Sequence, residues 1–200
     1  MGINLLDKGY NDVTTTIQGE FIKLPAGGYV CRIIFAEFQK SKAGNLMLVL
    51  SLDIADGEFA GYFKNATDSA TKFNKNKTWD NSGIYRQLLF DNSNQRISSF
   101  FKGLISCIEN SNDNFKINLT NFEPSSLLGK FCGFVFANEE YQKRDGSIGE
   151  HSVIKFPKTV SDIRSGHFKI PNTKKFEKPT VPISKDDFDG TPVPDDDLPF

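Results

Sequence analysis

Cations and aromatic rings alternate within one polar stretch of the chain. The residues are Lys64, Lys72, Phe73, Lys75, Lys77, Trp79, Tyr85 and Arg86. A flat ring can stack on a base of any kind, and a neighbouring cation can neutralise a phosphate. The pattern therefore indicates a surface for a single nucleic-acid strand. The alternative is a flexible loop whose two large rings, Phe73 and Trp79, fold back onto the body of the protein.

The last six residues form a second group with a definite chemistry. They are Asp195, Asp196, Asp197, Leu198, Pro199 and Phe200. An apolar end works against solubility, so a purely solubilising tail is a poor explanation. A partner with a basic rim, a hydrophobic slot for the ring and a cation for the terminal carboxylate would fit this sequence. The alternative is an acidic tail that is only solvated.

The formal net charge of −1 conceals an asymmetry between the body and the tail. Residues 186–200 contain six aspartates and no lysine or arginine. Without them the chain has 24 basic and 19 acidic residues, a net charge of +5. A mildly basic body with an acidic end is compatible with nucleic-acid binding.

Composition predicts an intracellular protein. Apolar residues make up 38% and charged residues 24% of the chain, and no apolar run approaches the roughly 20 residues of a membrane helix. The first residues lack the basic start and apolar core of a signal peptide. Cys31, Cys107 and Cys132 form no Cys-x-x-Cys pair that would indicate a metal or redox site. Cys31 and Cys132 lie in apolar runs, so we expect these two to be small buried apolar residues.

The hydrophobic pattern predicts strands before and after a single helix. Strands are expected over 29–38, 46–55 and about 58–65, with Asp56-Gly57 as a hairpin turn. Residues 65–83 form a polar insertion, and 83–90 is compatible with another strand. Two further strands are expected over 130–137 and 152–160.

The helix is indicated by a stripe of apolar residues at helical spacing. The stripe consists of Ile97, Phe100, Phe101, Leu104, Ile105 and Ile108. Residues 91–94 supply candidate N-caps, and the polar run 110–114 ends the helix. We expect this stripe to face the core rather than a partner.

This order of elements predicts an all-β fold with one helix, an OB-fold. That fold is a five-stranded Greek-key barrel with its helix between strands three and four. A β-sandwich would rarely place its one good helix there. The predicted organisation is an N-terminal extension (1–20), an OB-fold domain (21–170) with the insertion (65–83), a disordered linker (171–194) and the acidic tip (195–200).

Oligonucleotide-binding barrels grip their ligand with the loops of the first and last hairpins. The predicted hairpins carry Lys40 and Lys42 in the first, and Tyr141, Lys143 and Arg144 in the last. Each lysine alone is more often a solvated surface charge, so the argument depends on their shared location. Several further rings could be core or stacking platforms: Phe35, Phe38, Tyr62, Phe63 and Phe136.

Residues for catalysis are scarce. His151 and His167 are the only histidines, and neither lies in a metal-ligand motif. Asp53, Asp56 and Glu58 could hold magnesium, but they flank a hairpin turn where Asp-Gly is expected anyway. We therefore expect no enzyme activity, no metal and no cofactor.

Two stretches carry a family resemblance. The end of the chain, DDDLPF, resembles the acidic tip of bacterial single-stranded-DNA-binding proteins, which docks onto replication, recombination and repair enzymes. Residues 24–33 (LPAGGYVCRI) and 100–103 (FFKG) are similar to single-stranded-DNA-binding proteins of phages and mobile elements of Gram-positive bacteria. The polar start, the short Pro- and Lys-containing linker and the insertion depart from the cellular members, so a homotetramer is not carried over.

Residues and resemblance together lead to one expectation and two alternatives. We expect a non-enzymatic, largely sequence-independent single-stranded-DNA-binding protein of the bacterial cytoplasm, associated with the nucleoid, that recruits enzymes through residues 195–200. One alternative is an interaction module that uses the tip to divert host replication proteins without binding DNA. The other is an RNA-binding barrel.

Overall fold

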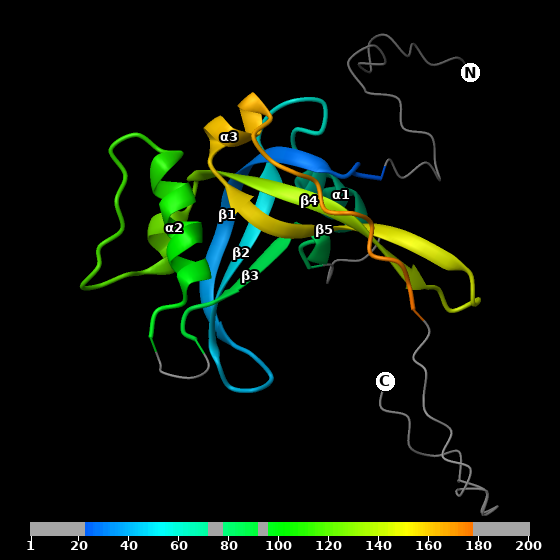
Figure 1. Cartoon of the computed structure of the whole chain (residues 1–200), viewed down its shortest axis with the longest axis horizontal. Coiled ribbons are helices and arrows are strands. Elements are labelled where there is room, and N and C mark those ends of the chain that lie inside the picture. The colour runs from blue at the N-terminus through cyan, green and yellow to red at the C-terminus, as the bar shows by residue number, and fades with distance from the viewer. Residues whose placement is uncertain (1–22, 72–77, 92–95, 178–200) are drawn as a thin grey trace, which may run out of the picture.

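The computed structural model describes residues 23–71, 78–91 and 96–177. They form one five-stranded antiparallel sheet with the strand order β3-β2-β1-β4-β5 (Figure 1). The strands are β1 (Gly27–Lys40), β2 (Leu46–Ile54), β3 (Ile84–Leu88), β4 (Phe131–Gln142) and β5 (Ile148–Lys158). The predicted antiparallel all-β character is confirmed. No helix within the described ranges is long and apolar enough to cross a membrane.

The long strand β1 lies at the centre of the sheet and pairs with both neighbours. Residues 27–32 pair with β4, and Cys31 to Lys40 pair with β2. The register with β2 shifts between Ile33 and Phe35, so Ile34 is an extra residue. A bulge of this kind bends the strand and increases its twist. The bend lets one strand serve two differently oriented halves of the sheet.

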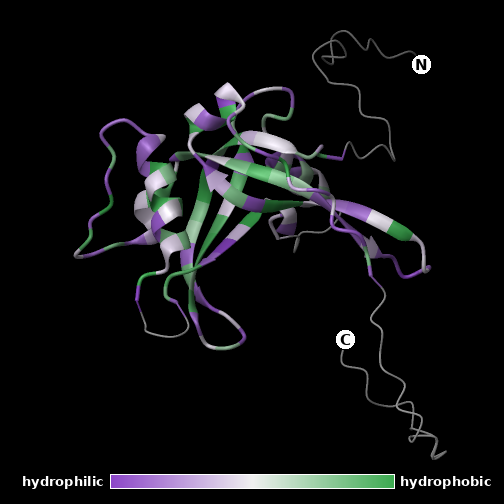
Figure 2. Ribbon diagram, in the orientation of Figure 1, coloured by the Kyte–Doolittle hydropathy of each residue, from purple (hydrophilic) through white to green (hydrophobic). Residues whose placement is uncertain are grey.

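The main core includes side chains of β1, β2 and β4. Leu48, Leu50 and Leu52 alternate along β2 and are fully buried, as are Phe134 and Phe136 of β4. Figure 2 shows hydrophobic colour concentrated along the strands, and polar colour on the loops. The period of two is what a strand needs to place every second side chain on one face.

The predicted strand over 58–65 is wrong, because the helix α1 (Tyr62–Thr71) begins there. Its N-terminal amide groups find an acceptor on β2: Asp53 Oδ1 accepts hydrogen bonds from the backbone of Phe63 (3.1 Å) and Lys64 (3.3 Å). The helix turns Phe63 fully into the core. A cap supplied by a distant residue leaves no local sequence signal. The third strand is β3, within the weaker prediction for 83–90.

The predicted helix exists as α2 (Ser99–Asn110), but it begins later than its apolar stripe. The N-cap is Ser98, whose Oγ accepts a hydrogen bond from Phe100 N (3.2 Å), and not a residue of 91–94. Ile97 therefore precedes the helix. Ile97 and Phe100 are 55% and 75% exposed, so the core prediction was wrong for these two. The other four residues of the stripe are buried: Phe101, Leu104, Ile105 and Ile108.

A short helix, α3 (Val160–Ser165), packs on two glycines of the sheet. A Cβ at Gly133 would lie 2.3 Å from Ile163 Cγ1, and one at Gly28 would lie 2.5 Å from the Phe168 ring. Ile163 forms a second small core with Val30 and Val135. Only glycine permits this approach of helix to strand.

Residues 171–177 lie along β4 rather than beginning a free linker. Lys174 N donates to Asn138 O (3.1 Å), and Glu140 N donates to Lys174 O (2.9 Å). Phe176 N also donates to the Glu140 carboxylate at 3.1 Å. The first part of the predicted disordered segment is thus held on the sheet. Residues 178–194, like the predicted extension 1–20, lie outside the described residues.

The predicted role of two cysteines as buried apolar residues is confirmed. Cys31 and Cys132 are fully buried, and they face each other across β1 and β4. Burial raises the pKa of the Cys31 and Cys132 thiols well above the usual range. Cys107 on α2 is half-buried. All three are free thiols.

Replacing Gly133 by alanine should lower the free energy of unfolding by about 1–3 kcal/mol, the usual cost of overfilling a packed site. The added methyl group would overlap Ile163 and lie 2.8 Å from Thr159 O, which is backbone and cannot move aside cheaply. Urea unfolding followed by circular dichroism measures the change.

Gly103→Ala is the matched control for this substitution. Nothing lies within 4 Å of a Cβ at this mid-helix position. The variant should be more stable by about 0.5–1 kcal/mol, because alanine loses less backbone freedom than glycine in a helix. Equal stability of Gly133→Ala and the native chain would show that α3 does not rest on this glycine.

Candidate nucleic-acid interface

The first hairpin presents its predicted cations to solvent. Lys40 is the last residue of β1, and Lys42 lies in the loop to β2; both are exposed. The loop is closed by a hydrogen bond from Ser41 N to Asn45 O (2.8 Å), and Gly44 takes a positive φ of 82°. The cations thus stand on a defined turn.

The last hairpin presents Lys143 and Arg144 at its tip and Tyr141 at the end of β4. All three are exposed. Asp145 stabilises the turn by accepting hydrogen bonds from the Ser147 hydroxyl (2.7 Å) and amide (3.0 Å). These bonds hold the pKa of the Asp145 carboxyl below its usual value. In Figure 1 this hairpin extends to the right and the first points downward, so the two tips do not meet.

Within the insertion, the described cation and ring from the predicted group form contacts with other residues of the protein. Lys64 on α1 forms an ion pair with Asp68 (2.5 Å). The Trp79 indole donates its N–H to Leu52 O (3.1 Å), and its half-buried ring packs against the main core. For Trp79 the structure favours the folded-back alternative. Four predicted members of the group lie outside the described residues: Lys72, Phe73, Lys75 and Lys77.

Tyr85 and Arg86 are neighbours on β3 and point to opposite faces of the sheet. Tyr85 faces the core: its ring centroid is 5.2 Å from that of Phe134, and its hydroxyl donates to Gln87 Oε1 (3.1 Å). Burial raises the pKa of Tyr85 to about 12. Arg86 is exposed, and its guanidinium donates to Asn81 Oδ1 at 3.0 Å. Because this partner is neutral, the hydrogen bond does not neutralise the positive charge of Arg86.

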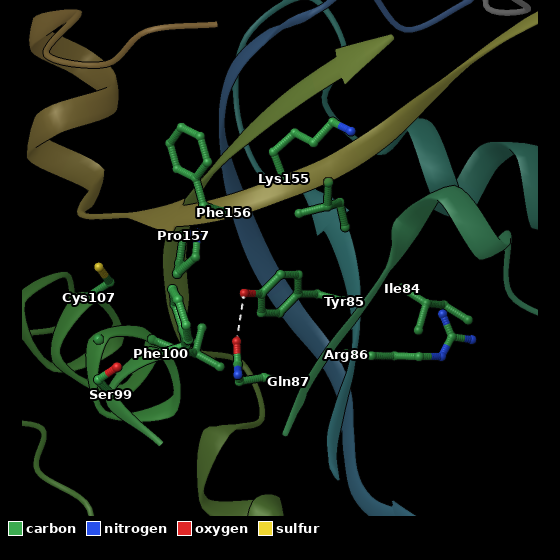
Figure 3. Close-up of a pocket in the computed structure, with 13 residues that line it drawn as sticks. Ile84, Tyr85, Arg86, Gln87, Ser99, Phe100, Cys107, Lys155, Phe156 and Pro157 are labelled. Atoms are coloured by element: carbon green, nitrogen blue, oxygen red, sulfur yellow. Dashed lines mark hydrogen bonds between the residues drawn. The ribbon is translucent and has the colours of Figure 1, made fainter. Parts of the chain in front are cut away.

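A cleft of about 770 Å³ separates the two edge strands, β3 and β5, next to the first turns of α2 (Figure 3). No Asp or Glu occurs among the described residues that line it. Its rings and cations come from three elements: Tyr85 and Arg86 from β3, Phe100 from α2, and Lys155, Phe156 and Pro157 from β5. We call this space the edge cleft.

A second hollow of about 770 Å³ shares the lining residues Phe156 and Pro157 with the edge cleft. The second hollow adds Lys158, Phe168 and Lys169. Not every cation is available, since the Lys155 ammonium pairs with Glu139. That hydrogen bond holds the pKa of the Glu139 carboxyl below its usual value. Together the two hollows are lined by several rings and cations.

The structure also shows which of the aromatic residues that the sequence left undecided belong to the core. Phe63 and Phe136 are fully buried, and Tyr62 is half-buried. Phe38 is 37% exposed and packs edge-on against Phe122. Phe35 is 48% exposed on β1, opposite Ser51 of β2. Phe35 is thus the member of this group with the most accessible ring.

Two of the three carboxylates considered for magnesium have other roles. Asp53 caps α1, and Asp56 pairs with Arg164 at 3.0 Å. The histidines also have protein neighbours: the rings of His151 and Tyr141 meet edge to face at 5.2 Å, and His167 Nδ1 lies 3.0 Å from Ser165 Oγ.

Sequence reasoning missed most of the residues around the edge cleft. The missed residues are Phe100, Lys155, Phe156, Lys158, Phe168 and Lys169. The alternation Lys155-Phe156-Pro157-Lys158 was a visible signal, but it was assigned only to a strand. Phe100 was assigned to the core because it shares the period of the buried stripe. The predicted tip, 195–200, lies outside the described residues.

Comparison with known proteins gives one family match. A family model described as "Protein of unknown function (DUF669)" matches residues 10–95. In the structure this span includes β1, β2, α1 and β3, and it ends before α2, β4 and β5. No curated protein matches the chain.

Tyr85 should make the protein lose stability at alkaline pH. Burial disfavours the charged tyrosinate, so the pKa is about 12 in the folded chain, against about 10 when unfolded. The contribution of Tyr85 to stability is complete below its pKa in the unfolded chain. It is lost as pH rises through its pKa in the folded chain. From about pH 9 to about 11.5, native protein should lose about 2 kcal/mol more stability than Tyr85→Phe.

Urea unfolding of both proteins at several pH values measures this difference. Tyr29, whose pKa is also raised to about 12 by burial, is present in both proteins and cancels in the comparison. Parallel stability curves for the two proteins would show that Tyr85 ionises as freely in the folded chain as in the unfolded one.

Proposed function

We propose that the protein binds single-stranded DNA without enzymatic activity and largely without regard to sequence. The observation that carries the proposal is the edge cleft and the second hollow, which are lined by rings and cations and in which no described lining residue is acidic. Stacking platforms beside phosphate-binding cations are what a sequence-tolerant single-strand site requires. In this role the protein would protect strands exposed during replication or recombination.

The topology supports an OB-fold as the scaffold. The strand order β3-β2-β1-β4-β5 is that of a five-stranded Greek-key barrel opened between its third and fifth strands. The helix α2 stands between β3 and β4, where an OB-fold has it. No pairing of β3 with β5 occurs among the described residues, and the edge cleft lies between these two strands.

The side chains suggest how a strand would be held. Phe100 presents a ring that is three-quarters exposed at the mouth of the cleft. Phe156 of β5 also lines the cleft, but its ring is half-buried and packs against the second small core. Arg86 lies on the edge strand β3, and its side chain is exposed. Lys158 and Lys169 continue the positive charge into the second hollow. Bases would stack on the rings while these cations follow the phosphates.

The cellular setting is also part of the proposal, and it rests on the family resemblance. We place the protein in the cytoplasm of a Gram-positive host, encoded by a phage or mobile element, with its acidic tip docking onto replication, recombination or repair enzymes. The described body ends at residue 177, beside the hairpin that carries Lys143 and Arg144.

Phe100→Ala should weaken binding to a thirty-base oligo-dT by about fivefold or more, since one stacked base contributes about 1–3 kcal/mol. Fluorescence anisotropy at low and moderate salt measures the dissociation constant. Affinity should fall as salt rises, because bound phosphates release counterions.

Leu119→Ala is the matched control, because it removes another exposed apolar side chain (88% exposed) that does not line either hollow. It should leave affinity unchanged. Duplex DNA should compete poorly, whereas equal competition by matched RNA would favour the RNA-binding alternative. Absence of binding to any strand at low salt, with the tip present or removed, would contradict the proposal and favour an interaction module.

Removal of residues 195–200 should tighten binding to oligo-dT at low salt. The tail carries closely spaced negative charge, as a short phosphate strand does, so it can compete for the same cations. The difference between full-length and truncated chains should shrink at high salt as charges are screened. Equal affinities at low salt would count against competition by the tail.

A further inference from the structure

A third, more enclosed hollow lies at the base of the β4–β5 hairpin. Its volume is about 250 Å³, and four segments far apart in the sequence contribute to it, the first being Lys23 and Leu24 before β1. Tyr62 comes from α1, Asp80 and Ser82 from the turn before β3, and Tyr141, Glu150 and His151 from the hairpin. We call it the hairpin pocket. It is smaller than the roughly 300–1,000 Å³ of pockets for drug-sized ligands, so it suits a single ring rather than a larger molecule.

One wall of the hairpin pocket is a ring held in a fixed position. Tyr141 lies across the ladder from Gly149, and a Cβ at that glycine would be 2.8 Å from Tyr141 Cζ. The ring therefore lies over the glycine, and it also meets the His151 ring edge to face, with 5.2 Å between the ring centroids. Tyr141 nevertheless remains 42% exposed. A ring that is accessible and already oriented can stack on a base at little entropic cost.

Another wall of the pocket carries the carboxylate of Asp80, one oxygen of which already accepts a hydrogen bond. Asp80 Oδ1 accepts a hydrogen bond from Ser82 N at 2.8 Å, which fixes the orientation of the side chain. Its Oδ2 accepts no hydrogen bond from another described residue. Glu150, the other carboxylate of the pocket, forms an ion pair with Lys23. An ionised carboxylate only accepts hydrogen bonds, so a ligand beside Asp80 must offer a hydrogen-bond donor, such as an amino N–H group.

We propose that the hairpin pocket binds one unstacked cytosine of the DNA strand, with its ring on Tyr141 and its exocyclic amino group donating to Asp80. Acceptance of a hydrogen bond from cytosine N4 is the typical base contact of Asp and Glu. Thymine has a carbonyl oxygen at that position, and this oxygen would face the carboxylate. Lys143 and Arg144 follow Tyr141 along the hairpin and can contact the adjoining phosphates. This inference rests on the proposed function, and it adds a base preference to it.

The test compares thirty-base oligo-dC with oligo-dT by fluorescence anisotropy at pH 8, using the full chain. The native protein should bind oligo-dC about fivefold more tightly, the advantage that one net hydrogen bond gives. Asp80→Asn keeps the cap but places an amide donor where Oδ2 was, so the preference should disappear or reverse. Tyr141→Ala should weaken binding to both oligonucleotides by about fivefold or more, and Tyr141→Phe should retain binding because it keeps the ring.

The outcomes separate this inference from the proposed function. If the native protein binds both oligonucleotides and neither Asp80→Asn nor Tyr141→Ala changes the affinities, the hairpin pocket is not a base site, and the proposed function stands. If it binds neither oligonucleotide, both proposals fail. Thermal unfolding shows whether Asp80→Asn has lost its cap. Should that variant unfold, the contrast between Tyr141→Ala and Tyr141→Phe decides.

Discussion

The fold depends on one strand that pairs with two partners. The first part of β1 is bonded to β4 and the second part to β2, and the change of register at Ile34 allows the bend between them. Without that bend, β3 and β5 would be opposite edges of a flat sheet. With it, the two edges approach closely enough to line one cleft. The position of the proposed binding surface is therefore a consequence of how β1 bends.

Two further contacts fix the elements around that sheet, and both involve groups that are distant in sequence. The Asp53 carboxylate receives the amide groups that begin α1, and so brings Phe63 into the core. Gly28 and Gly133 leave the space into which α3 and Phe168 pack. The first contact satisfies backbone donors that would otherwise be buried without a partner. The second places the ring and cations of the second hollow beside those of the edge cleft.

The proposed chemistry is divided between two kinds of surface. The edge cleft is open and carries rings and cations without described carboxylates, which suits binding that ignores sequence. The hairpin pocket is enclosed and pairs an oriented ring with a carboxylate, which suits discrimination between bases. Because Asp80 belongs to the turn that leads into β3, one short segment contributes to both surfaces.

Local patterns in the sequence determined the strands β1, β2, β4 and β5, the helix α2, and the turns of the β1–β2 and β4–β5 hairpins. Alternation, apolar stripes and glycine signals act over a few residues, so they can be read locally. They also pointed to Arg86, Tyr141, Lys143 and Arg144, all of which are exposed in the structure. Only the tertiary structure decided that residues 62–71 form a helix, that Trp79 folds back and that Phe100 faces outward. Each of these depends on a partner far along the chain: Asp53 for the helix, Leu52 for the indole, and β5 for the cleft that Phe100 borders. Periodicity reports which residues share a face, whereas the face that becomes buried is set by what packs against it.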